Sequence, residues 1–396
     1  MRLIHTADWH LCDRLGRVNR TPDLRARVER VAALCAEHAA DVLVVAGDLF
    51  SEQAQLDDMT AALEHLNREF AAFFARGGTI LAVTGNHDRE SRIELVRQGM
   101  RLATPAAGKE LQPGRAYLLN RPLATTLGGV QFLLVPYPTT VRYGLPTDQF
   151  VSKDDENRTL NTRVVDWLKG ATDSLDPKLP TVLVGHLHLA GAGMSHTLFK
   201  VTERDDVIFD TGHLELNRVQ YVALGHIHKP QALPGLPHVR YSGSLDRMAF
   251  DERDEEKGVV LVELGAGGLV GEPTVLPLPA TPMHRVVIAD PAAELPQLKE
   301  LVPEPAAALV HVTATYVPGG PTRDEIIRAV RAAFPRHTEI VWAKSAAAGA
   351  TGRPAGAHAD YRAEVRAHLD RELATDPDRA ALLDLTETFL TTEAGT

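Results

Sequence analysis

The stretch Thr79-Ile80-Leu81-Ala82-Val83-Thr84-Gly85-Asn86-His87-Asp88 indicates the fold of this chain most directly. Its apolar first half predicts a buried strand, and its last four residues predict a turn with an amide, an imidazole and a carboxylate. Open α/β sheets bind their ligands at the carboxyl ends of the strands, which is where this turn falls. Asn, His and Asp are also common in ordinary turns, so the stretch needs support from elsewhere in the chain.

Four further apolar strands end in turns that carry metal-ligand side chains. These turns are Asp8-x-His10, Gly47-Asp48, Gly185-His186-Leu187-His188 and Gly225-His226-Ile227-His228. Residues i and i+2 that leave a strand can point to the same side, so the ligands of one turn can converge. Carboxylate, imidazole and amide ligands suit Mn, Fe or Zn better than Ca or Mg. More than four ligands favour two metal ions, and a carboxylate such as Asp48 can bridge them.

Each turn alone also has an ordinary explanation, because Gly-Asp after a strand is usually only a turn. Five such turns in the same context favour a metal centre. The other histidines do not share this context: His38 and His65 lie in helical patterns, and His5 lies inside the first strand. The sequence leaves His188, His196 and His213 unassigned.

The order of apolar segments predicts an α/β fold. Strands Arg2–Thr6 and Val42–Ala46 alternate with a helix capped by Thr21 and a long helix from Leu56 to Gly77, as in parallel sheets with helical crossovers. We expect further strands at Val130–Val135, Thr181–Val184, Val219–Leu224, Val239–Ser242 and Val259–Leu264, and a helix at Asn157–Leu175. The polar segment Met194–Asn217 gives no clear pattern beyond a short strand at Val207–Phe209.

Composition shifts indicate how the chain is divided. Gly and Pro are frequent over Gly265–Pro282, so we expect a first domain over 1–275 and a small α+β unit over 280–345. Within that unit, strands are predicted at Arg285–Ile288, Ala308–Tyr316 and Thr338–Ala343, with helices at Ala292–Leu301 and Thr322–Phe334. Ala and Gly over 346–358 predict a flexible linker, and two amphipathic helices are expected within 359–396, near Tyr361–Ala374 and Asp378–Leu390.

The composition is that of a globular chain. Its 396 residues are 44% hydrophobic and 24% charged, and no apolar run approaches the ~20 residues that span a bilayer. The first residues predict a strand rather than a signal peptide, and Cys12 and Cys35 form no disulfide framework. We therefore expect a cytoplasmic protein with no membrane association. The net charge of −10 argues against a generic nucleic-acid binder, but residues 359–396 hold nine acids against four arginines, which is half of that excess.

The five motifs, in this order, resemble those of the calcineurin-like metallophosphoesterases, and within them the SbcD-type DNA repair nucleases. The amino-acid sequence is similar to that family over four segments: His5–Leu11, Ala46–Phe50, Tyr221–Lys229 and Tyr241–Leu245. The resemblance is specific over residues 1–265 and implies a metallophosphoesterase β-sandwich flanked by helices. It also implies that the small α+β unit is a DNA-capping domain and that the C-terminal helices bind an ATPase partner.

The resemblance further implies roles for individual residues. One metal ion would take Asp8, His10, Asp48 and His228, and the other Asp48, Asn86, His186 and His226. His87 would donate to the scissile phosphate or protonate the leaving oxygen. Asp88 would orient the imidazole of His87 or, equally, cap the following helix. Ser51 stands where relatives often carry a histidine, which affects rate and substrate preference rather than metal binding.

The leading hypothesis is therefore a nuclease with two divalent ions, with Mn²⁺ as the expected metal, that cuts DNA at ends or hairpins in double-strand-break repair. Its expected partners are DNA, an SbcC-like coiled-coil ATPase and a second copy of the chain. Arg14, Arg17 and Arg20 lie beside the first motif and are predicted to contact DNA phosphates, whereas Arg25, Arg27 and Arg30 more simply solvate a helix. The alternatives are a small-molecule phosphodiesterase or phosphatase and a DNA-tethering scaffold without catalysis; the complete ligand set argues against the scaffold.

Overall fold

The structure of the chain is a computed structural model that describes residues 1–103, 110–146, 149–193 and 206–343, and also 369, 379–380 and 382–383. Residues Met1–Lys344 form one compact unit and Ser345–Thr396 a second. The predicted linker lies outside the described residues, and so do the two predicted C-terminal helices apart from the five isolated positions.

Four parallel strands form the centre of the first sheet. They are β1 (Arg2–Thr6), β4 (Val42–Ala46), β5 (Thr79–Val83) and β6 (Ala116–Leu119), in this spatial order. On the other side of β1, β15 (Lys257–Gly265) pairs antiparallel, and both β16 (Gly268–Leu269) and β17 (Thr274–Leu278) pair antiparallel with β15. The predicted parallel sheet with helical crossovers is confirmed.

The second sheet has six strands. Its order is β13 (Gln231–Leu233), β14 (Leu236–Tyr241), β12 (Tyr221–Gly225), β9 (Thr181–His186), β8 (Val130–Val135) and β7 (Leu123–Leu127). Val44 and Val83 of the first sheet pack against Phe132 and Val184 of the second, all of them fully buried. The two sheets therefore form a sandwich whose apolar core lies between them.

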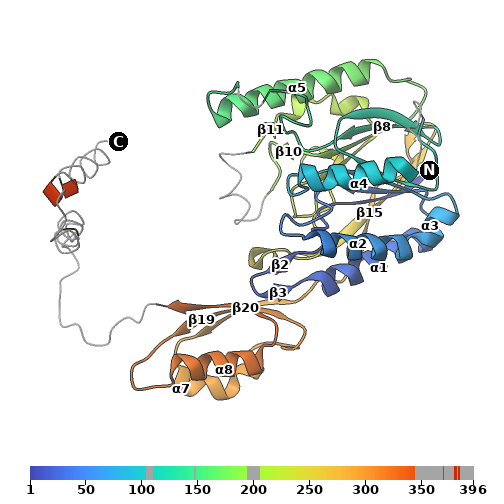
Figure 1. The fold of residues 1–396 in the computed structure, drawn as a ribbon. Helices are drawn as coiled ribbons and strands as arrows, with labels where there is room; N and C mark the ends of the chain where they lie inside the picture. The colour runs from blue at the N-terminus through green and yellow to red at the C-terminus, as the bar shows by residue number, and fades with distance from the viewer. Residues whose placement is uncertain are drawn as a thin grey trace. The chain divides into compact units, whose positions relative to one another are not determined.

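Helices cover both outer faces of the sandwich. In Figure 1, α5 (Lys153–Asp173) lies at the top, where it packs on the second sheet, and α1 (Thr21–Glu37) and α2 (Leu56–Glu69) lie below the strands, where they pack on the first. The short α3 (Ala71–Ala75) and α4 (Glu90–Ala103) complete this second layer of helices. The architecture is thus the α/β fold that the sequence predicts, with the β-sandwich flanked by helices that the resemblance implies.

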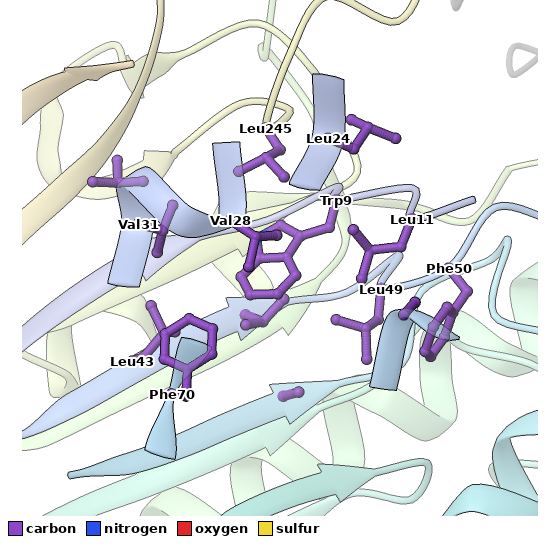
Figure 2. Close-up of a cluster of buried hydrophobic side chains, with 14 of the residues drawn as sticks. Trp9, Leu11, Leu24, Val28, Val31, Leu43, Leu49, Phe50, Phe70 and Leu245 are labelled. Atoms are coloured by element: carbon purple, nitrogen blue, oxygen red, sulfur yellow. The ribbon is translucent and has the colours of Figure 1, made fainter. Parts of the chain in front are cut away.

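The buried stripe of α1 matches the predicted one. Its buried residues are Leu24, Val28, Val31, Leu34 and Cys35. Figure 2 shows the indole of Trp9, which follows β1, among Val28 of α1, Leu43 of β4 and Phe70. The Trp9 indole N–H donates to Thr6 Oγ1 at 3.0 Å, so burying it leaves no unpaired donor. This packing fixes the chain immediately before His10.

Several predicted boundaries were wrong. The N-cap of α1 is Arg20, not Thr21. The long helix predicted from Leu56 to Gly77 is two helices that meet at Phe70, which is fully buried and stacks on Trp9. Strands β6 and β7 were not predicted, because four- and five-residue runs at half-buried positions give little periodicity.

The small α+β unit after residue 280 has a parallel sheet of β18 (Met283–Ile288), β19 (Leu309–Thr315) and β20 (His337–Ala343). One face of this sheet carries α7 (Pro291–Glu294), the 3₁₀ segment η4 (Leu295–Leu301) and α8 (Arg323–Ala333). The first turn of α8 has the predicted capping box, in which Thr322 and Glu325 satisfy each other's backbone N–H. No helix in the described part of the chain is long and apolar enough to cross a membrane.

Candidate metal centre

All five ligand-bearing turns lie at one edge of the sandwich, because β1, β4 and β5 are adjacent parallel strands and so are β9 and β12. Glycines let the ligand-bearing turns approach one another there. A Cβ on Gly225 would lie 2.0 Å from the carbonyl oxygen of Ala46, and one on Gly85 would lie 2.1 Å from Asp48 Oδ1. Side chains at these two positions would therefore push the ligand turns apart.

Four of the predicted ligands have left-handed backbone conformations. The φ angles are 50° at Asp8, 44° at His10, 50° at Asp48 and 93° at His226. Residues with a Cβ rarely adopt such angles and do so at a cost in free energy, so the surrounding packing must hold them. Strained backbone of this kind is common at functional sites.

The first ligand cluster contains Asp8, His10 and His228, whose ligand atoms lie close enough to share one ion. The Nε2 atoms of His10 and His228 are 3.2 Å apart. Nδ1 of His228 donates to Glu252 Oε1 at 2.9 Å, so its Nε2 presents a lone pair to the site. Two imidazole nitrogens at this distance need a proton or a cation between them, and a divalent cation fits this donor set.

The second cluster gathers acceptor atoms around Asn86. Nδ1 of His186 lies 2.8 Å from the carbonyl oxygen of Ala46, which can only accept, so in the neutral ring Nε2 is the nitrogen that faces the site with a lone pair. This Nε2 lies 2.9 Å from Asn86 Oδ1 and 3.3 Å from Asp48 Oδ2. Nδ1 of His226 lies 3.1 Å from the same Asn86 oxygen. The cluster is therefore suited to a cation.

Asp48 lies between the two clusters. Its Oδ2 is 3.3 Å from His186 Nε2 and 3.8 Å from His10 Nε2, and its Oδ1 accepts from the backbone N–H of His87 at 2.8 Å. A carboxylate in this place can bridge two ions, as the sequence predicts for Asp48. The structure thus brings together all seven predicted ligands: Asp8, His10, Asp48, Asn86, His186, His226 and His228.

The pKa values reflect crowded charge in a buried site. Burial lowers the pKa of His10 to about 3. Burial also opposes the charge on His186, but Asp48 and Asp8 outweigh it and raise its pKa to about 9. Burial raises the pKa of Asp8, whereas for Asp48 burial is outweighed by His186 and His10, which hold its pKa well below the usual range. The carboxylates that attract a proton to His186 would equally attract a metal ion.

Two buried carboxylates lie behind the predicted ligands, and neither of them was identified from the sequence. Glu252 accepts from His228 and also pairs with Lys257 Nζ at 2.8 Å, with both side chains almost fully buried. Asp206 accepts from His226 Nε2 at 2.7 Å and from His188 Nδ1 at 2.8 Å. Carboxylates that hold the outer nitrogen of a ligand histidine fix its tautomer and orientation. Glu252 stands in an acidic run and Asp206 in a patternless segment, so neither gave a distinguishing signal.

His87 and Asp88 have different surroundings. The ring of His87 is partly exposed, with its centroid 4.9 Å from that of His10. The buried Asp88 carboxylate accepts from the backbone N–H groups of Leu49, Phe50 and Gly85 at 2.8–3.1 Å. Burial and the nearby Asp48 raise the pKa of Asp88 to about 6. No hydrogen bond joins the Asp88 carboxylate to the ring of His87 in the part of the chain described, so Asp88 fixes the turns after β4 and β5 instead of orienting the imidazole.

The three predicted DNA-contacting arginines do not share one environment. Arg20 is fully buried: it donates to Asp23 Oδ2 at 2.9 Å and lies 3.2 Å from Asp246 Oδ2. A buried, paired guanidinium cannot reach DNA, so that expectation was wrong for Arg20. Arg14 and Arg17 are exposed on the hairpin of β2 (Arg14–Leu15) and β3 (Val18–Asn19), and their contact with DNA stays a prediction. Ser51 is buried and donates to Asp13 Oδ1 at 2.9 Å.

Comparisons with known proteins agree with this geometry. Residues 1–230, which contain all seven ligands, match the family model described as calcineurin-like phosphoesterase. The curated SbcD component of the nuclease SbcCD from Escherichia coli K12 is 28% identical over 325 residues, which cover 77% of this chain and 76% of that protein. Its namesakes from Rhodobacter capsulatus (27% over 316 residues; 75% and 74%) and Staphylococcus epidermidis (25% over 291 residues; 70% of each) are similarly related.

Proposed function

Since the chain belongs to the calcineurin-like phosphoesterases, enzymes that use divalent metal ions to hydrolyse phosphoesters, we propose that it is a two-metal DNA nuclease. It would hydrolyse phosphodiester bonds at DNA ends or hairpins in double-strand-break repair, in the cytoplasm, together with an SbcC-like ATPase. The observation that carries the proposal is the position of Asp48 between two clusters of ligands. The similarity to SbcD nucleases from three bacteria supports DNA as the substrate.

The proposed ligand sets follow the two clusters. Asp8, His10, Asp48 and His228 hold one ion, and Asp48, Asn86, His186 and His226 hold the other, with Mn²⁺ as the native metal. When bound, the two ions supply Lewis-acid polarisation of the phosphate and lower the pKa of the attacking water. Asp206 and Glu252 keep the outer nitrogens of His226 and His228 occupied, so the inner nitrogens stay aimed at the ions.

His87 is proposed as the proton donor. Its ring lies at the mouth of the site beside His10, and its own backbone N–H holds the carboxylate of Asp48. In this proposal the imidazole lies near the phosphate, and the hydrogen bond from its backbone N–H to the Asp48 carboxylate holds its main chain. It donates a proton to the leaving oxygen, a contribution of about 10²–10⁴-fold in rate for general acid catalysis.

The partners of the proposal are DNA, the ATPase and a second copy of the chain. Arg14 and Arg17 contact DNA phosphates, and the α+β unit beside their hairpin caps the DNA; Arg17 already donates to His337 of that unit at 2.6 Å. The helices expected within 359–396 bind the ATPase. A second copy covers the apolar cavity of about 590 Å³ between α2 and α4, where Leu56 and Leu95 are more than half exposed.

A nuclease assay on linear duplex DNA with Mn²⁺ tests the proposal. Asp48→Ala and His226→Ala should abolish hydrolysis, and EDTA should do so reversibly, whereas Asp57→Ala on the exposed side of α2 should keep the parent rate. Full activity in EDTA would contradict the metal site. Hydrolysis of small phosphate esters with none of DNA would instead favour a small-molecule phosphodiesterase or phosphatase.

A further inference from the structure

The Asp206 carboxylate is held by four donors. Its Oδ2 accepts from His226 Nε2 at 2.7 Å and from His188 Nδ1 at 2.8 Å. Its Oδ1 accepts from the hydroxyl of Tyr137 at 3.0 Å and from the backbone N–H of Val207 at 2.9 Å. The side chain is 3% exposed. A carboxylate this fully bonded has one orientation, and it presents that orientation to a proposed metal ligand.

The geometry points to His188 and Asp206 as positioning residues for the ion that His226 would hold, an inference that rests on the proposed function. Because the carboxylate only accepts, it requires the hydrogen of His226 on Nε2. The lone pair of His226 is then on Nδ1, the atom that lies 3.1 Å from Asn86 Oδ1. Without the carboxylate, the ring can take the other tautomer or rotate away from the site.

His188 supplies the second restraint on Asp206. It lies in β10 (His188–Leu189), which pairs in parallel with β11 (Ile208–Phe209). This pairing brings the ring of His188 beside Asp206, which lies two residues before β11. It is 4% exposed, and its Nδ1 shares the same carboxylate oxygen as His226. His188 thus keeps Asp206 against His226. His188, the second histidine of Gly185-His186-Leu187-His188, is not among the proposed metal ligands, and this contact gives it a role in the site.

Tyr137 closes the group from the other side. Its ring centroid lies 5.6 Å from that of His226 and 6.0 Å from that of His186, while its hydroxyl bonds to Asp206. The ring therefore packs beside both histidines of the second cluster. His188, Asp206 and His226 are also close enough to hold an ion themselves, which makes a third metal the competing explanation.

Calorimetric titration of the metal-free full chain with Mn²⁺ tests the inference. The parent should show two binding steps, of which His226→Ala removes one. Asp206→Asn and His188→Ala should weaken that same step by about 10–100-fold and leave the other step within about threefold. His188→Asn, which keeps a donor near the position of Nδ1, should recover most of the affinity. Asp210→Asn is the matched control, because this carboxylate is exposed and, among the described residues, accepts a hydrogen bond from the backbone N–H of Gly212 and from no other group.

The outcomes separate the inference from the proposed function. A parent that binds fewer than two ions overturns the two-metal function itself. If the parent binds two ions and both variants bind them with parent affinity, His188 and Asp206 do not position His226. Three ions in the parent, with the third lost in His188→Ala, would mean that the group is a metal site instead. Thermal unfolding of each variant verifies that it is folded. If Asp206→Asn does not fold, the affinity of His188→Ala for the second ion still tests the inference.

Discussion

Replacement of Arg20 by methionine should destabilise the protein without weakening its binding to DNA. The guanidinium is fully buried and donates to Asp23 Oδ2 at 2.9 Å and to the carbonyl oxygen of Arg247 at 2.8 Å. It also lies 3.2 Å from Asp246, whose carboxylate is equally buried. Methionine fills a similar volume but leaves these acceptors with fewer partners.

The size of the effect depends on what remains around Asp246. Removing one member of a buried ion pair costs about 3–5 kcal/mol, because the other charge stays buried. Arg27 Nε lies 3.4 Å from Asp246 Oδ2, and the hydroxyl and N–H of Thr281 donate to the carboxylate at 2.5 and 2.8 Å. With these partners retained, we expect the lower end, about 3 kcal/mol.

Equilibrium unfolding in urea measures this loss. For a slope near 3 kcal/mol/M, the midpoint should fall by about 1 M. Arg14→Met on the exposed hairpin is the matched control, and it should unfold within about 0.5 kcal/mol of the parent while binding duplex DNA more weakly. The reasoning fails if Arg20→Met unfolds at the parent midpoint and loses affinity for DNA.

Three further predictions concern chemistry, pH and the C-terminal segment. His87→Ala should keep two ions by elemental analysis but lose about 10²–10⁴-fold in turnover, since it acts as a proton donor and not as a ligand; loss of an ion would contradict this. Burial lowers the pKa of His5 from 6.5 to about 3, so the unfolded chain takes up a proton first as the pH falls. The free energy of unfolding should therefore drop by about 2 kcal/mol more in the parent than in His5→Gln between pH 7.5 and 5, and equal changes in urea midpoints would refute it. Deletion of residues 359–396 should preserve thermal stability and Mn²⁺-dependent nuclease activity but abolish co-purification with an SbcC-like ATPase; early melting would show instead that the segment folds back on the chain.

The sequence predicted the metal centre better than its surroundings. Ligands such as Asp48 and His226 directly follow apolar strands, and parallel strands bring their carboxyl ends together whatever the loops do. Glu252 and Asp206 reach the site from irregular segments, whose course depends on tertiary packing that no local pattern records. Arg20 shows the same limit, because its position in a basic loop indicated DNA, whereas Asp246, which lies against it in the buried interior, is far along the chain.

The left-handed backbone at Asp8, His10, Asp48 and His226 has a consequence for what limits the stability of this protein. Each such residue costs about 1–3 kcal/mol relative to a relaxed conformation, a cost that glycine largely avoids. Glycines at these turns would relieve the strain, but they would also remove the carboxylates of Asp8 and Asp48 that accept from the backbone N–H groups of His226 and His87. Selection for a robust fold and selection for a working site act in opposite directions at the same residues.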